Sequence, residues 1–327
     1  MVSKKINRDY SFDALKGFLI ILVIMGHAIQ LSTDVGGWSL NPLFMVIYTF
    51  HMPLFIFISG YFSMSIFRKS IWYIVTNKFK RLLLPSILFS SVICIIYFST
   101  SVIDDVSLIN KVYKCYKTYW YLINIFSLSI IYRLALKNKC TSMAFLAVYA
   151  LLLVFYDHLP SYFLKDCQII RMIPIFGLGL MFKKYKELVS KMKLKIKMRL
   201  FILIGVTVWL CLVRYCFGWD IIKYPITIRI GDGICCSLIV FYLFRFWYAK
   251  TKDNVIKNWL VVTGQQSLTL YLVHVVVVKF LMWNAYIPEF SYITMSILTA
   301  ILYFVSLLYI ITVKKIAQEK YLYVFGI

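Results

Sequence analysis

Long apolar runs separated by short polar segments make up most of the chain. A helix needs about 20 apolar residues to cross a bilayer, and the runs are bounded by charged residues or by Gly, Pro and Asn. The pattern predicts ten membrane-spanning helices. They cover residues 14–31, 42–67, 82–103, 118–135, 142–157, 167–182, 200–218, 233–249, 263–282 and 291–313. Ten spans leave only short loops, so we expect an all-α integral membrane fold with one domain, residues 1–327.

The first apolar run has two interpretations. Lys4, Lys5 and Arg8 before it match the charged start of a signal peptide. No small-x-small cleavage site follows, however, and His27 and Gln30 interrupt the apolar residues. We therefore expect this run to remain in the protein as the first span.

Composition agrees with a membrane protein. The 327 residues are 62% hydrophobic and 15% charged, with a mean hydropathy of +0.81, whereas soluble domains carry about 25% charged residues. These values exclude a disordered chain and a soluble nucleic-acid-binding domain. Eight cysteines lie scattered without a Cys-x-x-Cys or Cys/His cluster, so neither a metal site nor a disulfide framework is predicted.

The net charge of +23 is explained by the distribution of the basic residues. Most of them fall in the N-terminal segment, in the C-terminal tail and in alternate loops at residues 68–81, 137–139, 183–199 and 250–257. Basic residues collect in the cytoplasmic loops of membrane proteins. The bias therefore predicts that both termini are cytoplasmic. Nucleic acid is not expected as a partner.

The loop at residues 183–199 is the most basic of these segments, with lysines alternating with apolar residues. One interpretation is a topology determinant that lies on anionic membrane lipid. The other is a docking surface for a polyanionic cosubstrate.

Ionisable residues within spans are expensive, and they therefore indicate function. The first span carries Asp13, Lys16 and His27. Lys16 and His27 are eleven residues apart, about three helical turns, so they share a face and lie about 16 Å apart along the axis. Asp13 is close to the same face. Snorkelling of Lys16 to the interface and a purely packing role for His27 are the alternatives.

Two other predicted spans also carry a histidine. His51 precedes Pro53, which kinks a helix and frees a backbone carbonyl. His274 shares a helical face with Ser267 and Tyr271. These features indicate a cavity wall and a polar stripe. We hypothesise that the three spans bring His27, His51 and His274 to one buried proton-transfer site. His158, in a short predicted loop, is interpreted as a solvated residue.

Cations near the ends of two other spans are further candidates. Arg171 opens the span at 167–182, where it either snorkels or binds an anion or a sugar oxygen. Lys78 and Arg81 lie just before the span at 82–103. They are explained by topology or by recognition of a phosphate-bearing cosubstrate.

Taken together, these residues resemble the membrane acyltransferase-3 family, especially its fucose-O-acetylase-like branch. Four segments carry the resemblance and occur in the expected order: Arg8-Asp9-Tyr10 with Phe12-Asp13-Ala14-Leu15-Lys16-Gly17 and Gly26-His27; Phe50-His51-Met52-Pro53-Leu54-Phe55 with Ser59-Gly60-Tyr61; Lys78-Phe79-Lys80-Arg81 with Pro85; and Gly264 to His274.

The resemblance implies a roughly ten-helix enzyme that transfers an acyl group, usually acetyl from cytosolic acetyl-CoA, to a carbohydrate hydroxyl. Acetyl-CoA or another acyl-CoA is then a cosubstrate and no cofactor is bound permanently. The acceptor is a polysaccharide or a lipid-linked sugar, and the location is a bacterial inner or plasma membrane. The family's basic-x10-His motif falls on Lys16 and His27, and its Arg-x-x-Arg element on Lys78 and Arg81. Lysine at the first position of each keeps the charge but not the bidentate geometry of arginine.

Ester formation needs a base for the sugar hydroxyl and donors for the tetrahedral oxyanion. We expect His27 to be the base, with His51 and His274 as a proton relay or as oxyanion donors together with Tyr271. Lys16, Lys78 and Arg81 are expected to hold the coenzyme phosphates. Asp13 is expected to orient Lys16 or to hold the charge of the site. Direct transfer and an acetyl-histidine intermediate both remain open.

Three rival hypotheses remain at this stage. Embedded His and Arg residues also line the paths of transporters, so a flippase for a lipid-linked glycan is the main alternative. An acyltransferase that uses succinyl-CoA or another acyl donor is the second. A structural membrane protein is the third, and it predicts that His27 and His51 tolerate alanine.

Overall fold

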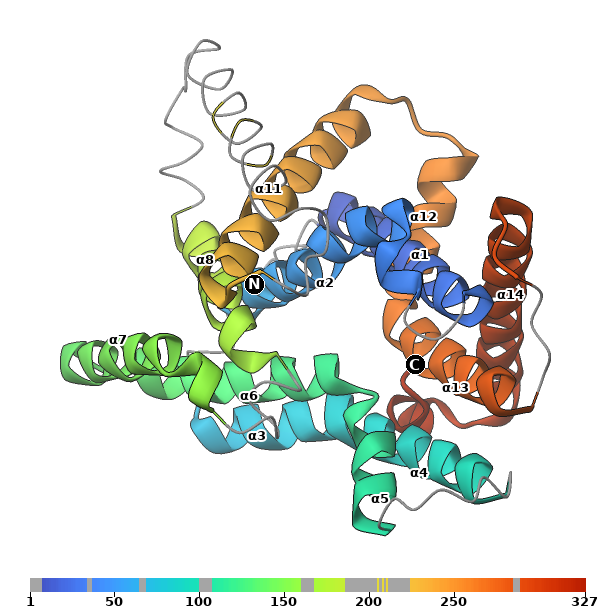
Figure 1. The fold of residues 1–327 in the computed structure, drawn as a ribbon, viewed down its shortest axis with the longest axis horizontal. Coiled ribbons are helices and arrows are strands. Elements are labelled where there is room, and N and C mark those ends of the chain that lie inside the picture. The colour runs from blue at the N-terminus through green and yellow to red at the C-terminus, as the bar shows by residue number, and fades with distance from the viewer. Residues whose placement is uncertain are drawn as a thin grey trace, which may run out of the picture.

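The structure is a computed structural model that describes residues 8–33, 37–64, 69–99, 108–159, 168–185, 205, 208, 210, 224–284 and 289–327. Every regular element within these ranges is helical (Figure 1). The helices are α1 (Tyr10–Ser32), α2 (Pro42–Ser63), α3 (Ile71–Lys78), α4 (Leu84–Ser99), α5 (Leu108–Lys117), α6 (Trp120–Ala135), α7 (Lys139–Val154), α8 (Ile169–Lys184), α11 (Ile226–Lys250), α12 (Val255–Gln265), α13 (Ser267–Asn284) and α14 (Tyr292–Ile316). Shorter turns are η1 (Gly37–Leu40), η3 (Phe79–Leu83), η4 (Tyr156–His158) and η7 (Glu319–Phe325).

Within the described residues, five helical segments are long and apolar enough to cross a membrane. They are α1, α2, α11, α14 and the continuous segment Ile71–Ser99, which joins α3, η3 and α4. The pair α12 and α13 passes the same test together, with a bend of 75° between them. The all-α membrane fold is therefore confirmed. The count of ten spans and the cytoplasmic termini stay predictions, and the expected span at 200–218 lies almost wholly outside the described residues.

Two predicted boundaries were wrong. The basic stretch at 68–81 was expected to be a loop, but helix begins at Ile71, because the Ser70 side chain caps it by accepting from the Tyr73 backbone N–H. The span expected at 263–282 is broken: α12 ends at Gln265, and a new helix begins at Ser267. This bend determines where the polar stripe on α13 lies.

Local sequence explains where the two central helices begin. Asp9 caps α1 by accepting from the Ser11 backbone N–H. Asn41 caps α2 through the N–H groups of Leu43 and Phe44, and Pro42 occupies the first turn, where its missing N–H has no consequence. α2 is the most enclosed of the five spans, with 78% of its apolar window buried, and α1 follows with 56%.

Glycines set the two closest helix crossings. A Cβ at Gly17 of α1 would collide with the Leu260 carbonyl of α12, and a Cβ at Gly264 of α12 would collide with the Asp13 carbonyl. At the second crossing, Gly60 of α2 lies against the Phe176 carbonyl of α8, and Gly179 lies against Phe57. Small residues let backbones approach in membrane bundles.

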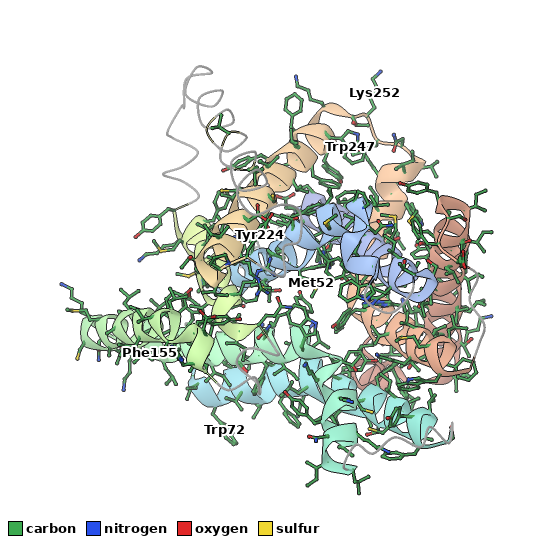
Figure 2. All side chains as sticks on the ribbon, in the orientation of Figure 1. Met52, Trp72, Phe155, Tyr224, Trp247 and Lys252 are labelled. Atoms are coloured by element: carbon green, nitrogen blue, oxygen red, sulfur yellow. The ribbon has the colours of Figure 1, made fainter. Side chains whose placement is uncertain are left out.

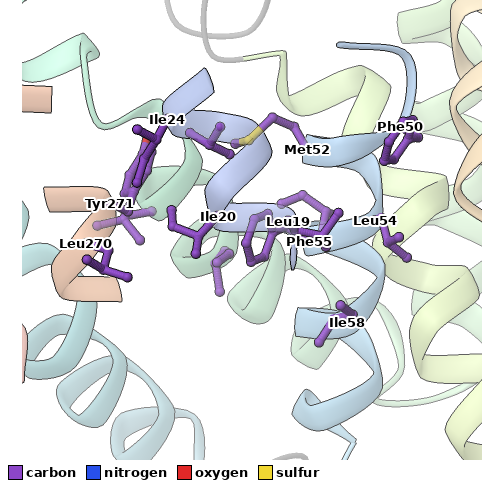
Figure 3. Packing of buried hydrophobic residues seen from close by; sticks show 14 of the residues in the cluster. Leu19, Ile20, Ile24, Phe50, Met52, Leu54, Phe55, Ile58, Leu270 and Tyr271 are labelled. Atoms are coloured by element: carbon purple, nitrogen blue, oxygen red, sulfur yellow. The ribbon is translucent and has the colours of Figure 1, made fainter. Parts of the chain in front are cut away.

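The apolar core surrounds α1. In Figure 3, side chains of α1 such as Leu19 and Ile20 lie between those of α2 and α13, including Phe55 and Leu270. Large apolar side chains on the outer helices face away from this core. Trp72 and Phe155, 73% and 53% exposed, lie at the periphery of the molecule (Figure 2). Such faces suit contact with lipid.

Candidate active site

The structure brings two of the three membrane histidines into direct contact. The rings of His27 on α1 and His274 on α13 have centroids 5.3 Å apart. His51 on α2 lies within electrostatic reach of His27. The consecutive helices α1 and α2 and the distant helix α13 therefore converge on one polar cluster inside the bundle.

Hydrogen bonds to carbonyl oxygens orient each ring. Nδ1 lies 2.6 Å from the Leu270 carbonyl in His274 and 2.7 Å from the Ile47 carbonyl in His51. In His27 it lies 2.7 Å from Oε1 of Gln30. Because a carbonyl oxygen only accepts, Nδ1–H donates, and a neutral ring keeps its lone pair on Nε2. Each histidine can therefore act as a base through Nε2, which favours the base and relay roles over oxyanion donation.

The three histidine rings differ in how deeply they are buried. His274 is fully buried, and its Nε2 has no hydrogen-bond partner among the described residues. His51 is 2% exposed, whereas His27 is only partly buried. His27 is therefore the most accessible of the three rings, and His274 packs against it.

Tyrosines complete the surroundings of the histidines. The Tyr271 ring lies 5.9 Å from His274 and 5.6 Å from Tyr121. Tyr48 packs edge-on against His51 at 4.5 Å, and the absence of a side chain at Gly26 makes room for the Tyr48 ring. Sequence reasoning found Tyr271 but missed Tyr48 and Tyr121, because an aromatic residue in an apolar run has no distinguishing spacing.

A cavity of about 140 Å³ leads toward this cluster. Its polar lining comes from four helices: Lys16 of α1, Ser59 of α2, Tyr121 of α6, and Ser267 and Tyr271 of α13. The remaining lining is apolar. The Ser59 and Tyr121 hydroxyls are 3.3 Å apart and form a hydrogen bond. Three of the predicted site residues, Lys16, Ser267 and Tyr271, thus share one cavity.

Asp13 forms an ion pair with Lys16, the charged residue that lines this cavity. Its Oδ1 accepts from the Lys16 ammonium at 2.8 Å, and its Oδ2 accepts from the Arg8 guanidinium at 2.7 Å. The Lys16 side chain remains 27% exposed. Asp13 is fourteen residues from His27, about 21 Å along a helix, so it orients Lys16 and does not contact the histidines.

Lys78 and Arg81 lie at a π-helical turn, η3, that follows α3. Such turns are rare and recur at functional sites. Leu82 of this turn lines the cavity that contains Lys16. Lys78 is partly buried and Arg81 is exposed. The structure therefore sets the second basic element beside the cavity, although neither side chain of the motif lines it.

Arg171 lies apart from the cavity. It is buried near the start of α8, and its Nη1 donates to Oε1 of Gln168 at 3.2 Å. The charge of Asp232 on α11 acts on the same guanidinium. Sequence reasoning missed Asp232, because it immediately precedes the predicted span at 233–249.

His158 is exposed in η4, as expected of a solvated residue. Within the described ranges, no group of His, Cys, Asp and Glu side chains is arranged to hold a metal ion. The loop predicted at 183–199 lies outside the described residues beyond Tyr185.

Comparison with known sequences identifies the family. The profile of the acyltransferase-3 family, described as an acyltransferase domain, matches residues 9–314. The chain belongs to this acyltransferase family. The match covers both halves of the site, from Lys16 and His27 to Tyr271 and His274. This protein is therefore a membrane O-acyltransferase.

Two similar proteins are both nodulation protein NolL. That of Sinorhizobium fredii is 28% identical over 289 residues, which is 82% of this chain and 77% of its own. That of Mesorhizobium japonicum is 28% identical over 290 residues, or 82% of this chain and 76% of its own. No solved structure matches the chain.

Proposed function

We propose that this acyltransferase moves an acetyl group from acetyl-CoA to a hydroxyl of a cell-surface or lipid-linked carbohydrate. The observation behind the proposal is that Lys16 and Tyr271 line one cavity, that Tyr271 contacts His274, and that His274 contacts His27. Both NolL relatives come from bacteria, which supports a bacterial cell membrane as the location.

The charged end of the cavity suits the donor. Lys16, assisted by Lys78 and Arg81, would bind the coenzyme phosphates by charge-assisted hydrogen bonds. The mainly apolar lining would accept the extended thiol arm. Lys16 and His27 are about 16 Å apart along the helix, so an arm that follows the cavity would bring its thioester toward His27.

His27 would act as the general base. Its Nε2 takes the proton of the acceptor hydroxyl while that oxygen attacks the thioester carbonyl, and the oxyanion then collapses with loss of the coenzyme thiolate, which receives a proton. The Tyr271 and Tyr121 hydroxyls are the nearest neutral donors for the oxyanion. In the alternative route, Nε2 of His27 attacks the thioester carbonyl first and expels the coenzyme thiolate. The sugar hydroxyl then displaces the imidazole from the acetyl carbon, and the hydroxyl proton passes to the thiolate.

The transfer itself is tested with membranes that contain the protein and membranes that lack it. Both receive acetyl-labelled acetyl-CoA and the host's surface glycans. We expect base-labile label in the glycans only where the protein is present. Transfer from succinyl-CoA but not from acetyl-CoA would correct the donor. Absence of label with either donor, together with movement of lipid-linked glycan across the membrane, would replace the proposal with a flippase.

Lys16→Met is expected to raise the KM for acetyl-CoA about tenfold or more and to change kcat little. A hydrogen bond to a charged group contributes about 1.5–3 kcal/mol, and 1.4 kcal/mol corresponds to a factor of ten. The measurement is initial rate against acetyl-CoA concentration, with Lys16→Arg expected to retain affinity. Lys252→Met, at an exposed loop position (Figure 2), is the matched control. An unchanged KM in Lys16→Met would remove Lys16 from the donor site.

A further inference from the structure

A second polar cluster lies where α2, α8 and α11 meet, and the donor cavity does not include it. Its members are Arg171 near the start of α8, and Arg229 and Asp232, one turn apart on α11. Arg171 is 7% exposed and Asp232 is 0% exposed. Buried charges inside a membrane protein are expensive and mark functional sites.

The hydrogen-bond inventory of Arg171 is incomplete. Nη1 donates to Gln168, but Nε and Nη2 are buried and have no partner among the described residues. Nε–H and Nη2–H lie on the same edge of a guanidinium. This edge donates two parallel hydrogen bonds to a carboxylate or phosphate. Nε of Arg229 is also buried without a described partner.

The free edge of Arg171 lies near Pro53 of α2. A Cβ added at Gly233 of α11 would be 3.6 Å from Arg171 Nη2 and 3.3 Å from Pro53 Cγ. Pro53 is two residues after His51, and His51 is within electrostatic reach of both Arg171 and His27. The cluster therefore adjoins the histidines from a different side than the cavity that contains Lys16.

The cluster carries a net positive charge. The charged groups that act on Arg171 within the described structure are Arg229 and Asp232, with Tyr156 nearby. Among the described residues, the two guanidinium groups and the one carboxylate leave a surplus of one positive charge. Burying a charge whose hydrogen-bond donors have no partner costs free energy. An anion bound to the free edge of Arg171 would reduce this cost.

We propose that Arg171 binds the acceptor through two oxygens of an anionic group, either the carboxylate of an acidic sugar or the phosphate of a lipid-linked sugar. The inference rests on the proposed function, because it assigns this group to the acceptor. It makes the chain selective for anionic over neutral glycans. Arg229 and Asp232 then set the charge of the subsite.

The test is binding, measured apart from catalysis. Detergent-purified protein is heated with glucuronate, inorganic phosphate or glucose at equal concentrations, and the shift in Tm is recorded, since a ligand that binds the folded state raises Tm. We expect glucuronate, phosphate or both to raise Tm, and glucose not to. The anion that acts distinguishes an acidic sugar from a phosphate. No shift with either anion, or an equal shift with glucose, would overturn the proposal.

Arg171→Lys keeps the charge but lacks the two-donor edge, so we expect anion affinity to fall at least tenfold while the Tm shift caused by acetyl-CoA stays. Arg133→Lys, on the exposed end of α6, is the matched control. If Arg171→Lys does not accumulate, Arg229→Gln serves instead, because it removes one of the two positive charges that would attract the anion. Wild-type affinity for the anion in the variant that accumulates would contradict the subsite.

The two proposals fail separately. Anion binding by a wild-type protein that transfers no acetyl group would leave the subsite standing and remove the proposed function. Acetyl transfer with an Arg171-independent KM for the acceptor would do the reverse.

Discussion

His27→Ala is expected to lower acyl transfer by about 10²–10⁴-fold, the usual contribution of a general base, with normal abundance of the protein in the membrane. His27 is the more accessible member of the His27–His274 pair. Its Nδ1–H donates to Gln30, so the lone pair of Nε2 is available to accept a proton. Initial rates of label transfer at saturating acetyl-CoA give the ratio.

Two companion variants refine this result. Gln30→Leu removes the hydrogen bond that orients the ring, and misplacement of a catalytic group by about 1 Å can cost 10²-fold in rate. His158→Ala, an exposed histidine outside the cluster, should transfer at the wild-type rate. Equal rates for His27→Ala and wild type at equal protein level would show that another group is the base, and fully buried His274 would be the next candidate.

The second large effect concerns folding. Gly264→Val should sharply reduce the amount of folded protein. Any Cβ at this position collides with the Asp13 carbonyl and with the Gly17 backbone nitrogen of α1. Overpacking costs about 1–3 kcal/mol and occasionally more, and here the obstacle is backbone, which cannot rotate away. Membrane abundance and the Tm in detergent measure the effect.

Gly205→Ala is the matched control, since a Cβ there meets no described atom within 4 Å. The same crossing contains Lys16, between Asp13 and Gly17. Any Gly264 variant that does fold should therefore bind acetyl-CoA more weakly. A Gly264→Val protein with wild-type abundance and Tm would show that α1 and α12 are not packed as closely as described here.

Sequence pattern predicted the parts of the site that lie along one helix. Lys16 and His27 share a face because eleven residues make about three turns, and Ser267, Tyr271 and His274 follow the same periodicity on α13. These relations depend only on helix geometry. The apolar runs likewise predicted α1 and α2, where the caps Asp9 and Asn41 begin the helices close to the expected positions.

What the sequence did not predict depends on packing between helices. Tyr48 and Tyr121 enter the site because neighbouring helices bring them there. No proline marks the helix break at Gln266 in the sequence. The π-helical turn at 79–83 has the sequence of an ordinary basic loop. Asp232 was missed because the apolar run that predicts the span at 233–249 starts one residue after it. Its carboxylate is nevertheless fully buried.

If one chain takes an acetyl group at the Lys16 cavity and delivers it to a carbohydrate at His27, the purified protein alone should carry out the transfer. The measurement uses purified protein in liposomes with acetyl-labelled acetyl-CoA and a defined acidic glycan, followed by mass analysis of the glycan. We expect base-labile acetyl esters with wild-type protein and almost none with His27→Ala. Acetylation that proceeds equally with both, or that never occurs although both proteins are folded and bind acetyl-CoA, would contradict it.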